Sequence, residues 1–354
     1  MVAHSKADAP PHRTLVAGVV VTAVVLVAGL CWAKWTPYLA KATAAARTHH
    51  WSGSDILAVG GVHAGDRPTW SAATAFFHAY VTSIWPALLV ALLISACVQA
   101  FVPRAWLPRL LNRRGPVSSA VAGSVASMPS MMCTCCAAPV AVTLRGSGVA
   151  RGAAVAYWLG NPLLNPAVLV FLLFVAPWQW TLTRLVVGAA TVVGTAALVG
   201  VMTRGRDDTE LPGLDGTGGA EEAPRGRRFI AGLVKWCLVL MAEYAVIVLL
   251  IGATRGWVLS LIQPANHGLL IVLVAAVLGT LMVIPTAGEI PILQGLALLG
   301  LSQGVIGALL ITLPAVSLPG AAMVARSFGT KVVGVTAAMV VAAGLVGAAT
   351  LSLL

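Results

Sequence analysis

The chain has 354 residues, of which 59% are hydrophobic and 9% are charged, and its mean hydropathy is +0.93. Soluble domains carry about 25% charged residues, so this composition excludes a soluble globular domain and predicts a polytopic helical membrane protein. The net charge of +11 does not indicate a nucleic-acid partner, because the basic residues lie in short connections between apolar runs, as cytoplasmic loops do.

The first apolar run, Leu15–Ala33, is about long enough to cross a bilayer as a helix. A signal peptide is the alternative, but the run exceeds a usual signal sequence and lacks a clear cleavage site, which favours a retained span. Residues 34–73 are interpreted as a mixed polar loop with solvated histidines. Ala75–Val102 is the second predicted span, and the arginine cluster after it indicates the cytoplasmic side.

The remaining apolar segments fall into two halves around a polar linker at 203–228, which has too little apolar content to fold alone. The first half contains Val117–Leu144, interrupted by Pro129 and Pro139; Ala153–Val175, with Asn161-Pro162 and Asn165-Pro166; and Leu182–Met202. The second half contains Phe229–Ala253 with Glu243; Leu269–Leu299, broken by Pro285 and Pro291 around Glu289; Val305–Val324; and Val332–Leu353.

The two halves align at a constant shift of 152 residues, which indicates an internal repeat. The shift places Pro139 on Pro291, Gly148 on Gly300, Gly152 on Gly304, Pro162 on Pro314 and Thr134 on Thr286. Matching proline-interrupted segments in two halves of a membrane protein point to the binding site of a secondary transporter.

The distribution of arginines predicts that the repeats are inverted. If Val117–Leu144 and Leu269–Leu299 enter the membrane and return as re-entrant hairpins from opposite faces, every strongly basic connection falls on one side. The predicted fold is therefore all-α, with about seven full spans and two proline-broken hairpins. Its parts are an N-terminal span and extracytoplasmic loop (1–73), a first transport repeat (74–202), a cytoplasmic linker (203–228) and a second transport repeat (229–354).

Three cysteines, Cys133, Cys135 and Cys136, lie within four residues at the expected tip of the first hairpin. Thiolates bind soft centres such as Cu(I), Zn(II) or trivalent arsenic, so the three sulfurs are candidate substrate ligands and candidate metal ligands. The alternative is that they only pack, as we expect for the isolated Cys31, Cys97 and Cys237.

Polar residues near the hairpins are the other candidates. Asn161 and Asn165 share a helix face and could bind the tips or a substrate, or could satisfy backbone groups freed by the prolines. Glu243 and Glu289 are the acids within apolar segments and are candidates for proton coupling. Either acid could instead form a structural hydrogen bond. Pro129, Pro139, Pro285 and Pro291 are the predicted hairpin breaks.

The run CTCCAAPVAVTLRGSGVARGAAVAYWLGNPLLNP resembles the bacterial predicted-permease family that includes ArsP-type organoarsenical efflux permeases and YraQ-like membrane proteins. The resemblance covers roughly residues 75–354 and implies a permease of the inner membrane. For ArsP-type members it further implies export of trivalent organoarsenicals through a cysteine pair that corresponds to Cys133 and Cys135. The sequence departs from the family pattern at Cys136, where a glycine is expected, so the site offers a third thiol.

The sequence therefore predicts a multi-pass plasma-membrane permease, not an enzyme, whose partners are the lipid bilayer and a small thiophilic solute; it indicates no cofactor. One alternative is a membrane thiol-disulfide oxidoreductase that uses Cys133 and Cys136, and a second is a scaffold within a larger complex. The duplicated proline-broken segments favour transport, because redox chemistry does not require them.

Overall fold

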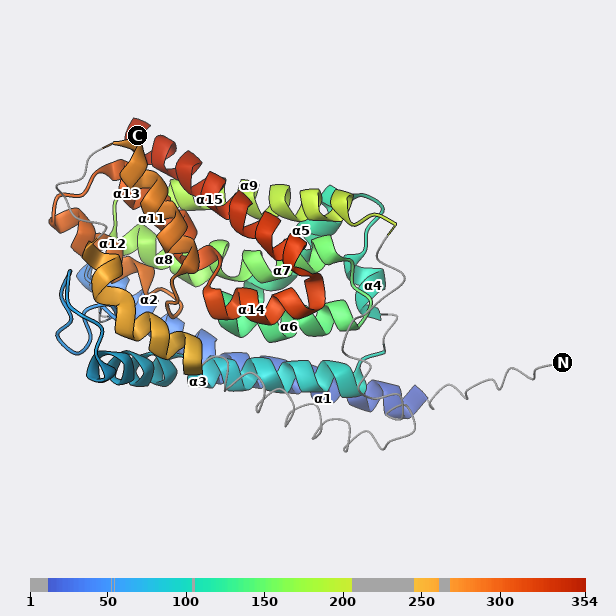
Figure 1. Cartoon of the computed structure of the whole chain (residues 1–354). Coiled ribbons are helices and arrows are strands. Elements are labelled where there is room, and N and C mark those ends of the chain that lie inside the picture. Colours follow the sequence, from blue (N-terminus) through green and yellow to red (C-terminus); the bar gives the residue numbers. More distant parts are fainter. Residues whose placement is uncertain (1–11, 52, 54, 104–105, 206–244, 261–267) are drawn as a thin grey trace.

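The computed structural model describes residues 12–51, 53, 55–103, 106–205, 245–260 and 268–354, and all regular elements in these ranges are helices (Figure 1). Within the same ranges, five helices are long and apolar enough to cross a membrane, and a bent pair of shorter helices makes a sixth candidate. This confirms an all-helical membrane protein. The predicted span Phe229–Ala253, including Glu243, lies largely outside the described residues.

The first span is longer than predicted. Helix α1 (His12–Leu30) continues through a π-helical turn, η1 (Cys31–Trp35), into α2 (Thr36–Thr48), so that one apolar helix extends from Val16 to Thr48. The interpretation of residues 34–73 as a loop was wrong for residues 34–48. The predicted loop began at residue 34, directly after the uninterrupted apolar run, whereas Lys34 is buried within the protein. Helix α3 (Trp70–Phe101) is the second span, and Thr69 caps its N-terminus.

The first half then contains a short helix and a broken segment. Helix α4 (Trp106–Leu111) is followed by α5 (Pro116–Ser127). A 3-10 turn, η2 (Met128–Ser130), and a short irregular stretch then lead to α6 (Thr134–Gly146). The Asn112 side chain donates to the Gly148 carbonyl at 3.1 Å and accepts from the Ala150 amide at 2.8 Å. The chain before α5 and the turn after α6 therefore lie side by side.

Three helices complete the first half: α7 (Arg151–Leu163), α8 (Pro166–Val175) and α9 (Trp178–Met202). Helices α7 and α8 are separated at the predicted Asn-Pro steps, since proline lacks the amide that would continue the helix. Asn165 caps α8, its side chain accepting from the amides of Ala167 and Val168.

The second half follows the same order of elements. After the helix Ala245–Ser260 come α11 (Leu269–Leu281), α12 (Glu289–Leu298), α13 (Gln303–Ala315), α14 (Leu318–Phe328) and α15 (Thr330–Leu353). Helices α11 and α12 are separated by an irregular segment at 282–288, and α13 and α14 meet at an angle of 51°. The second half is thus broken at two places, as the first half is.

The helix bounds repeat with the offset that the sequence predicts. Helices α13, α14 and α15 begin at residues 303, 318 and 330, each 152 residues after the first residues of α7, α8 and α9 at 151, 166 and 178. In Figure 1, α9 ends near the start of α15, and α15 ends at the C-terminus at the opposite end of the molecule. The two equivalent helices therefore run in opposite directions.

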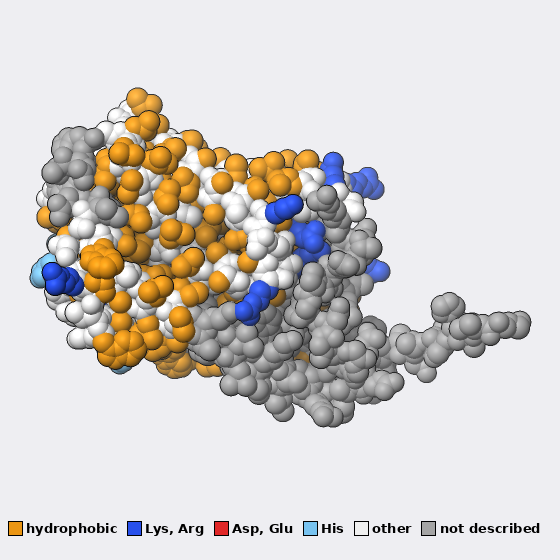
Figure 2. Space-filling view, viewed as in Figure 1, with side chains coloured by type: hydrophobic (Ala, Val, Ile, Leu, Met, Phe, Trp, Pro, Cys, Tyr) orange, Lys and Arg blue, Asp and Glu red, His pale blue; other side chains and the backbone are white. Residues whose placement is uncertain are grey.

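Surface composition agrees with a membrane environment. Apolar side chains cover the middle of the face in Figure 2, and most visible Lys and Arg side chains gather toward the end where α15 begins, with a smaller group at the opposite end. Basic residues at one end of an apolar surface are typical of the cytoplasmic side of a membrane protein, and the assignment of this end to the cytoplasm stays a prediction.

Candidate functional site

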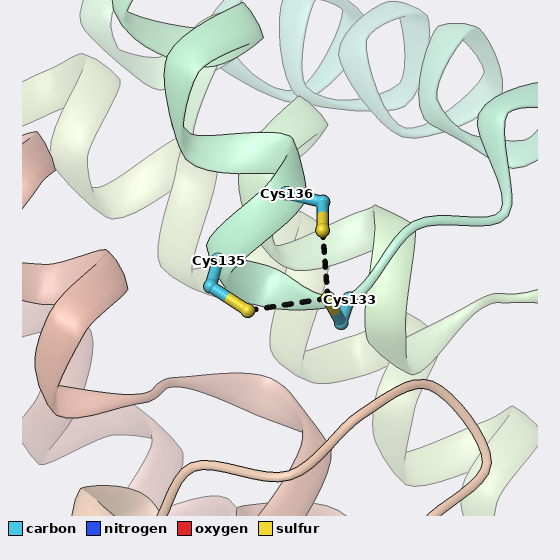
Figure 3. Close-up of side chains that lie close together, drawn as sticks. All are labelled: Cys133, Cys135 and Cys136. Atoms are coloured by element: carbon cyan, nitrogen blue, oxygen red, sulfur yellow. Dashed lines mark hydrogen bonds between the residues drawn. The ribbon is translucent and has the colours of Figure 1, made fainter. Parts of the chain in front are cut away.

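The three clustered cysteines converge at the start of α6 (Figure 3). The Cys133 Sγ lies 3.2 Å from the Sγ of Cys135 and 3.2 Å from that of Cys136, and all three sulfurs lie within 4.8 Å of one another. Each side chain is at most 5% exposed. The thiols are free. A soft centre with bonds of about 2.3 Å holds its sulfurs about 3.7 to 4.0 Å apart, which is close to the spacing of these three sulfurs.

The local backbone explains why the sulfurs converge. Cys133 is the N-cap of α6 in an extended conformation, while Cys135 and Cys136 lie in the first turn of the helix. Met131, two residues before Cys133, has a left-handed φ of 49° and lies between η2 and α6. Ala287 in the second break also has a positive φ, of 66°. Left-handed residues other than glycine are uncommon and concentrate at functional sites.

Asn161 fixes the tip that carries the cysteines. Its Oδ1 accepts from the Ser130 hydroxyl at 2.5 Å and from the Met132 amide at 3.2 Å, and its Nδ2 donates to the Tyr157 carbonyl at 2.9 Å. Asn165 lies one turn further and caps α8 rather than contacting the tip, and its buried Nδ2 has no hydrogen-bond partner within the described residues. The structure thus gives both asparagines a role in satisfying backbone groups near the breaks.

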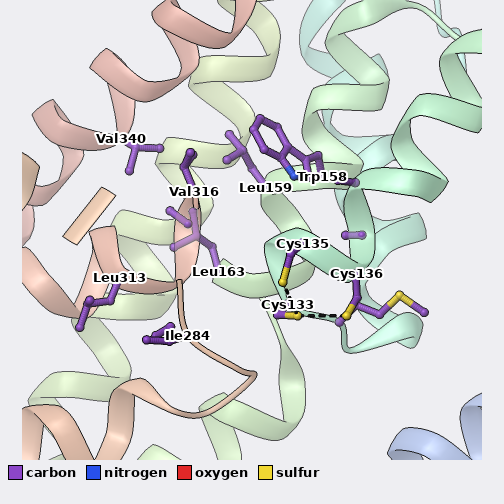
Figure 4. Packing of buried hydrophobic residues seen from close by; sticks show 14 of the residues in the cluster. Cys133, Cys135, Cys136, Trp158, Leu159, Leu163, Ile284, Leu313, Val316 and Val340 are labelled. Atoms are coloured by element: carbon purple, nitrogen blue, oxygen red, sulfur yellow. Dashed lines mark hydrogen bonds between the residues drawn. The ribbon is translucent and has the colours of Figure 1, made fainter. Parts of the chain in front are cut away.

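Thr134 connects this tip to the other half of the protein. Its hydroxyl donates to the Pro314 carbonyl at 2.5 Å, at the end of α13, while its own carbonyl accepts from the Trp158 indole at 3.0 Å. Figure 4 shows the cysteines beside Trp158 and Leu163 of α7, with Val316, Leu313 and Ile284 of the second half nearby. The cysteine cluster therefore lies where the two halves meet.

Glu289 makes the reciprocal connection. Its carboxylate pairs with the guanidinium of Arg184, a residue of α9, at 2.7 Å, and both side chains are almost fully buried. Arg184 also donates to the carbonyls of Pro162, at 2.8 Å, and Leu163, at 3.4 Å, at the end of α7. We did not predict Arg184 from the sequence. It is an isolated arginine within the apolar run Leu182–Met202, and a charged residue in such a run usually pairs with an opposite charge, so Glu243 and Glu289 could have been proposed as its partners.

Lys34 is the second residue that the sequence interpretation missed. Its side chain is 6% exposed, and its Nζ donates to the Tyr38 hydroxyl at 2.8 Å and to the Thr286 hydroxyl at 3.1 Å, in the break before Glu289. The neighbouring Trp35 donates from its indole to the Pro129 carbonyl at 2.8 Å, so η1 contacts both breaks.

The remaining candidates have distinct positions. Pro129 lies in η2 and Pro285 in the 282–288 segment, whereas Pro139 lies inside α6 and Pro291 in the first turn of α12. The Tyr80 hydroxyl lies 2.8 Å from the Cys135 sulfur. Glu243 lies outside the described residues.

Comparisons with known proteins agree with the resemblance noted in the sequence. A family model described as a predicted permease, ArsP_1, matches residues 69–352. The UPF0718 protein YraQ of Escherichia coli (strain K12) is 39% identical over 327 residues, covering 91% of this chain and 91% of its own. No solved structure matches the chain. The chain belongs to the ArsP_1 family of predicted permeases, which indicates a transporter rather than an enzyme.

Proposed function

We propose that the protein is a secondary transporter that exports a thiophilic solute, such as a trivalent organoarsenical or a soft metal species, through the site formed by Cys133, Cys135 and Cys136. The observation that carries the proposal is the convergence of three buried thiols within 4.8 Å at a broken helix where the two halves meet. Irregular backbone at membrane depth is tolerated where protein shields it or where it lines a transport path.

The architecture supports alternating access. In this proposal α5–α6 and α11–α12 are re-entrant hairpins of two inverted repeats, residues 74–202 and 229–354, joined by the cytoplasmic linker 203–228. The chain then crosses the membrane seven times in addition to the two hairpins. Five crossings are the long helices, one is the bent pair α13–α14, and one is the predicted span Phe229–Ala253. The contact of Asn112 with the turn after α6 supports a first hairpin that returns to its side of entry.

Coupling to protons is assigned to Glu289, with Glu243 as the second candidate. Glu289 is suited to the role because its charge is balanced by Arg184, which also bonds carbonyls at the end of α7. When Glu289 is protonated, its ion pair with Arg184 is lost, and Arg184 keeps only its hydrogen bonds to the carbonyls at the end of α7. Protonation would therefore weaken the contact between the second hairpin and the first half. The proposed location is the plasma membrane.

Transport is tested in everted membrane vesicles, in which an exporter accumulates its solute. We expect Cys133→Ser and Cys135→Ser each to abolish accumulation of a trivalent phenylarsenical or of Cu(I), while Cys97→Ser, at a buried cysteine of α3 apart from the cluster, leaves it unchanged. A protonophore should abolish accumulation if protons drive export. Normal accumulation in both cysteine variants would contradict a transport site at these thiols.

A thiol-disulfide oxidoreductase is the alternative that one observation favours. Cys133 and Cys136 are an N-cap and first-turn pair with sulfurs 3.2 Å apart, the arrangement in which C-x-x-C pairs are reactive. Quinone-linked thiol oxidation is therefore measured in the same vesicles. If Cys136→Ser removes thiol oxidation and the cysteine variants retain solute accumulation, the oxidoreductase function replaces the transport proposal.

A further inference from the structure

The cysteine cluster offers three sulfur donors and, within the described residues, no fourth ligand of another kind. The group of side chains there that lie close enough to share a metal ion consists of Cys133, Cys135 and Cys136, without a histidine or a carboxylate. Cys133 is the common neighbour, since its sulfur lies 3.2 Å from each of the other two. A structural zinc ion usually takes four protein ligands. The site therefore fits a centre that is complete with three sulfurs.

The spacing of the sulfurs favours a pyramidal centre. A centre that keeps a lone pair has bond angles of about 95°, so bonds of about 2.3 Å hold its sulfurs about 3.4 Å apart. Tetrahedral or planar centres with bonds of the same length hold theirs about 3.7 to 4.0 Å apart. Both distances from the Cys133 sulfur are 3.2 Å, which is nearer to the pyramidal value. Trivalent arsenic and antimony are thiophilic centres of this pyramidal kind.

Charge balance favours the same centres. Each of the three cysteines is at most 5% exposed, and a net charge at so buried a place is strongly unfavourable. Three thiolates carry three negative charges, which a trivalent centre cancels. The same thiolates would leave one negative charge with Zn(II) and two with Cu(I). A trivalent centre therefore forms a neutral complex with all three sulfurs.

The side chains around the sulfurs favour a small solute. The Tyr80 hydroxyl lies 2.8 Å from the Cys135 sulfur, and the Trp158 indole donates to the Thr134 carbonyl between Cys133 and Cys135. Figure 4 shows Trp158 beside the cysteines. Tyr80 and Trp158 are themselves fully buried. An inorganic centre whose hydroxyl ligands leave on binding needs less room here than an arsenical that keeps an aryl group.

We infer that Cys136 is a specificity-determining residue of the transport site and that the site selects the trihydroxides of arsenic(III) and antimony(III). Such a solute reacts with three thiols to form three bonds to sulfur. Its three oxygens leave as water with the three thiol protons, so no oxidation or reduction occurs. An arsenical with one As–C bond has only two positions to exchange. The inference rests on the proposed function, since the solute must bind at the cysteines, and it assigns the third bond to Cys136.

Arsenite and phenylarsine oxide are the two probes, because they differ in the number of thiols that they accept. X-ray absorption at the arsenic K-edge counts the sulfurs around arsenic in the purified full chain in detergent. We expect three sulfurs with arsenite and two with phenylarsine oxide. Arsenite bound to Cys136→Ser should show two sulfurs and one oxygen, whereas Cys97→Ser, at a buried cysteine apart from the cluster, should keep three sulfurs.

Affinity provides the second measurement. Dissociation constants are obtained from the protection of Cys133 and Cys135 against maleimide labelling, followed by mass spectrometry. We expect Cys136→Ser to weaken arsenite at least about hundredfold and phenylarsine oxide less than about tenfold, because only arsenite loses a third bond formed within a complex that two sulfurs already hold.

Two sulfurs around arsenite in the unsubstituted protein would overturn the inference and leave the proposed transport site intact, and this count does not depend on whether a variant folds. Equal weakening of both probes in a folded Cys136→Ser variant would also overturn it. Failure of both probes to bind the cysteines would instead contradict the proposed function itself.

Discussion

Arg184 and Glu289 join the two halves of the protein through a buried ion pair with an N–O distance of 2.7 Å. Arg184 bonds the Pro162 carbonyl, and Thr134 of the first half bonds the Pro314 carbonyl, which is the equivalent position 152 residues later. Thr134 therefore binds the end of α13 in the other half directly, whereas Glu289 reaches the end of α7 only through Arg184 of α9. One connection is a neutral hydroxyl and the other is a charged pair.

Separating the charged pair should destabilise the protein strongly. Arg184→Gln or Glu289→Gln alone leaves a buried charge without its partner, and we expect a loss of about 3 to 5 kcal/mol. The double variant removes both charges and should recover much of that loss. The apparent melting temperature of the purified protein in detergent measures these effects. Additive losses in the double variant would show that the two charges do not depend on each other.

The hydrogen bond between Thr134 and Pro314 should contribute less to the free energy of unfolding than the ion pair does. Thr134→Val removes the hydroxyl that bonds Pro314 and keeps the shape of the side chain, so we expect a loss of about 0.6 to 1.7 kcal/mol, as for other hydrogen bonds inside membrane proteins. Thr134→Ser keeps the donor and is the control. The same melting measurement applies, and equal stability of the two variants would contradict a stabilising role for this bond.

The repeat was predictable from sequence because it depends on local turn chemistry. Pro162 and Pro314 each lie one residue before the end of a helix, α7 and α13, because proline has no amide hydrogen to continue the helix. The spacing of these two prolines along the chain therefore gave the same offset of 152 residues that the first residues of the helices show. The convergence of Cys133, Cys135 and Cys136 was likewise readable, because the residues are adjacent along the chain.

The charged partners were not predictable in the same way. Glu289 was recognised as an isolated acid, but its partner Arg184 lies in another helix of the other half, and no periodicity relates the two positions. Lys34 was placed in the predicted loop 34–73, whereas in the structure its ammonium donates to the hydroxyls of Tyr38 and Thr286 inside the protein. Both charged residues are buried because of contacts with segments far away in the sequence, and the sequence alone does not show which segments meet.

Close helix packing in the first half predicts a sensitive glycine. A Cβ at Gly123 of α5 would overlap the Ala153 carbonyl of α7, so Gly123→Ala should cost about 1 to 3 kcal/mol through overpacking. Gly194→Ala in α9 meets open space and should be neutral or stabilising, since alanine favours helices. Both are measured by thermal unfolding in detergent, and an equal response at the two positions would contradict the packing of α5 on α7.

Asn161 should control the geometry of the cysteines without touching a solute. Its side chain fixes Ser130 and the Met132 amide, so Asn161→Leu leaves the tip unsupported and should weaken binding of an aryl arsenoxide by about tenfold or more. Leucine occupies the equivalent position, Leu313, in the second half, and Leu313→Met serves as the matched control. Because a loosened tip exposes thiols that are at most 5% exposed here, maleimide labelling of the cysteines should accelerate in Asn161→Leu even as arsenoxide binding weakens. Unchanged labelling together with unchanged binding would show that the cysteine arrangement does not depend on Asn161.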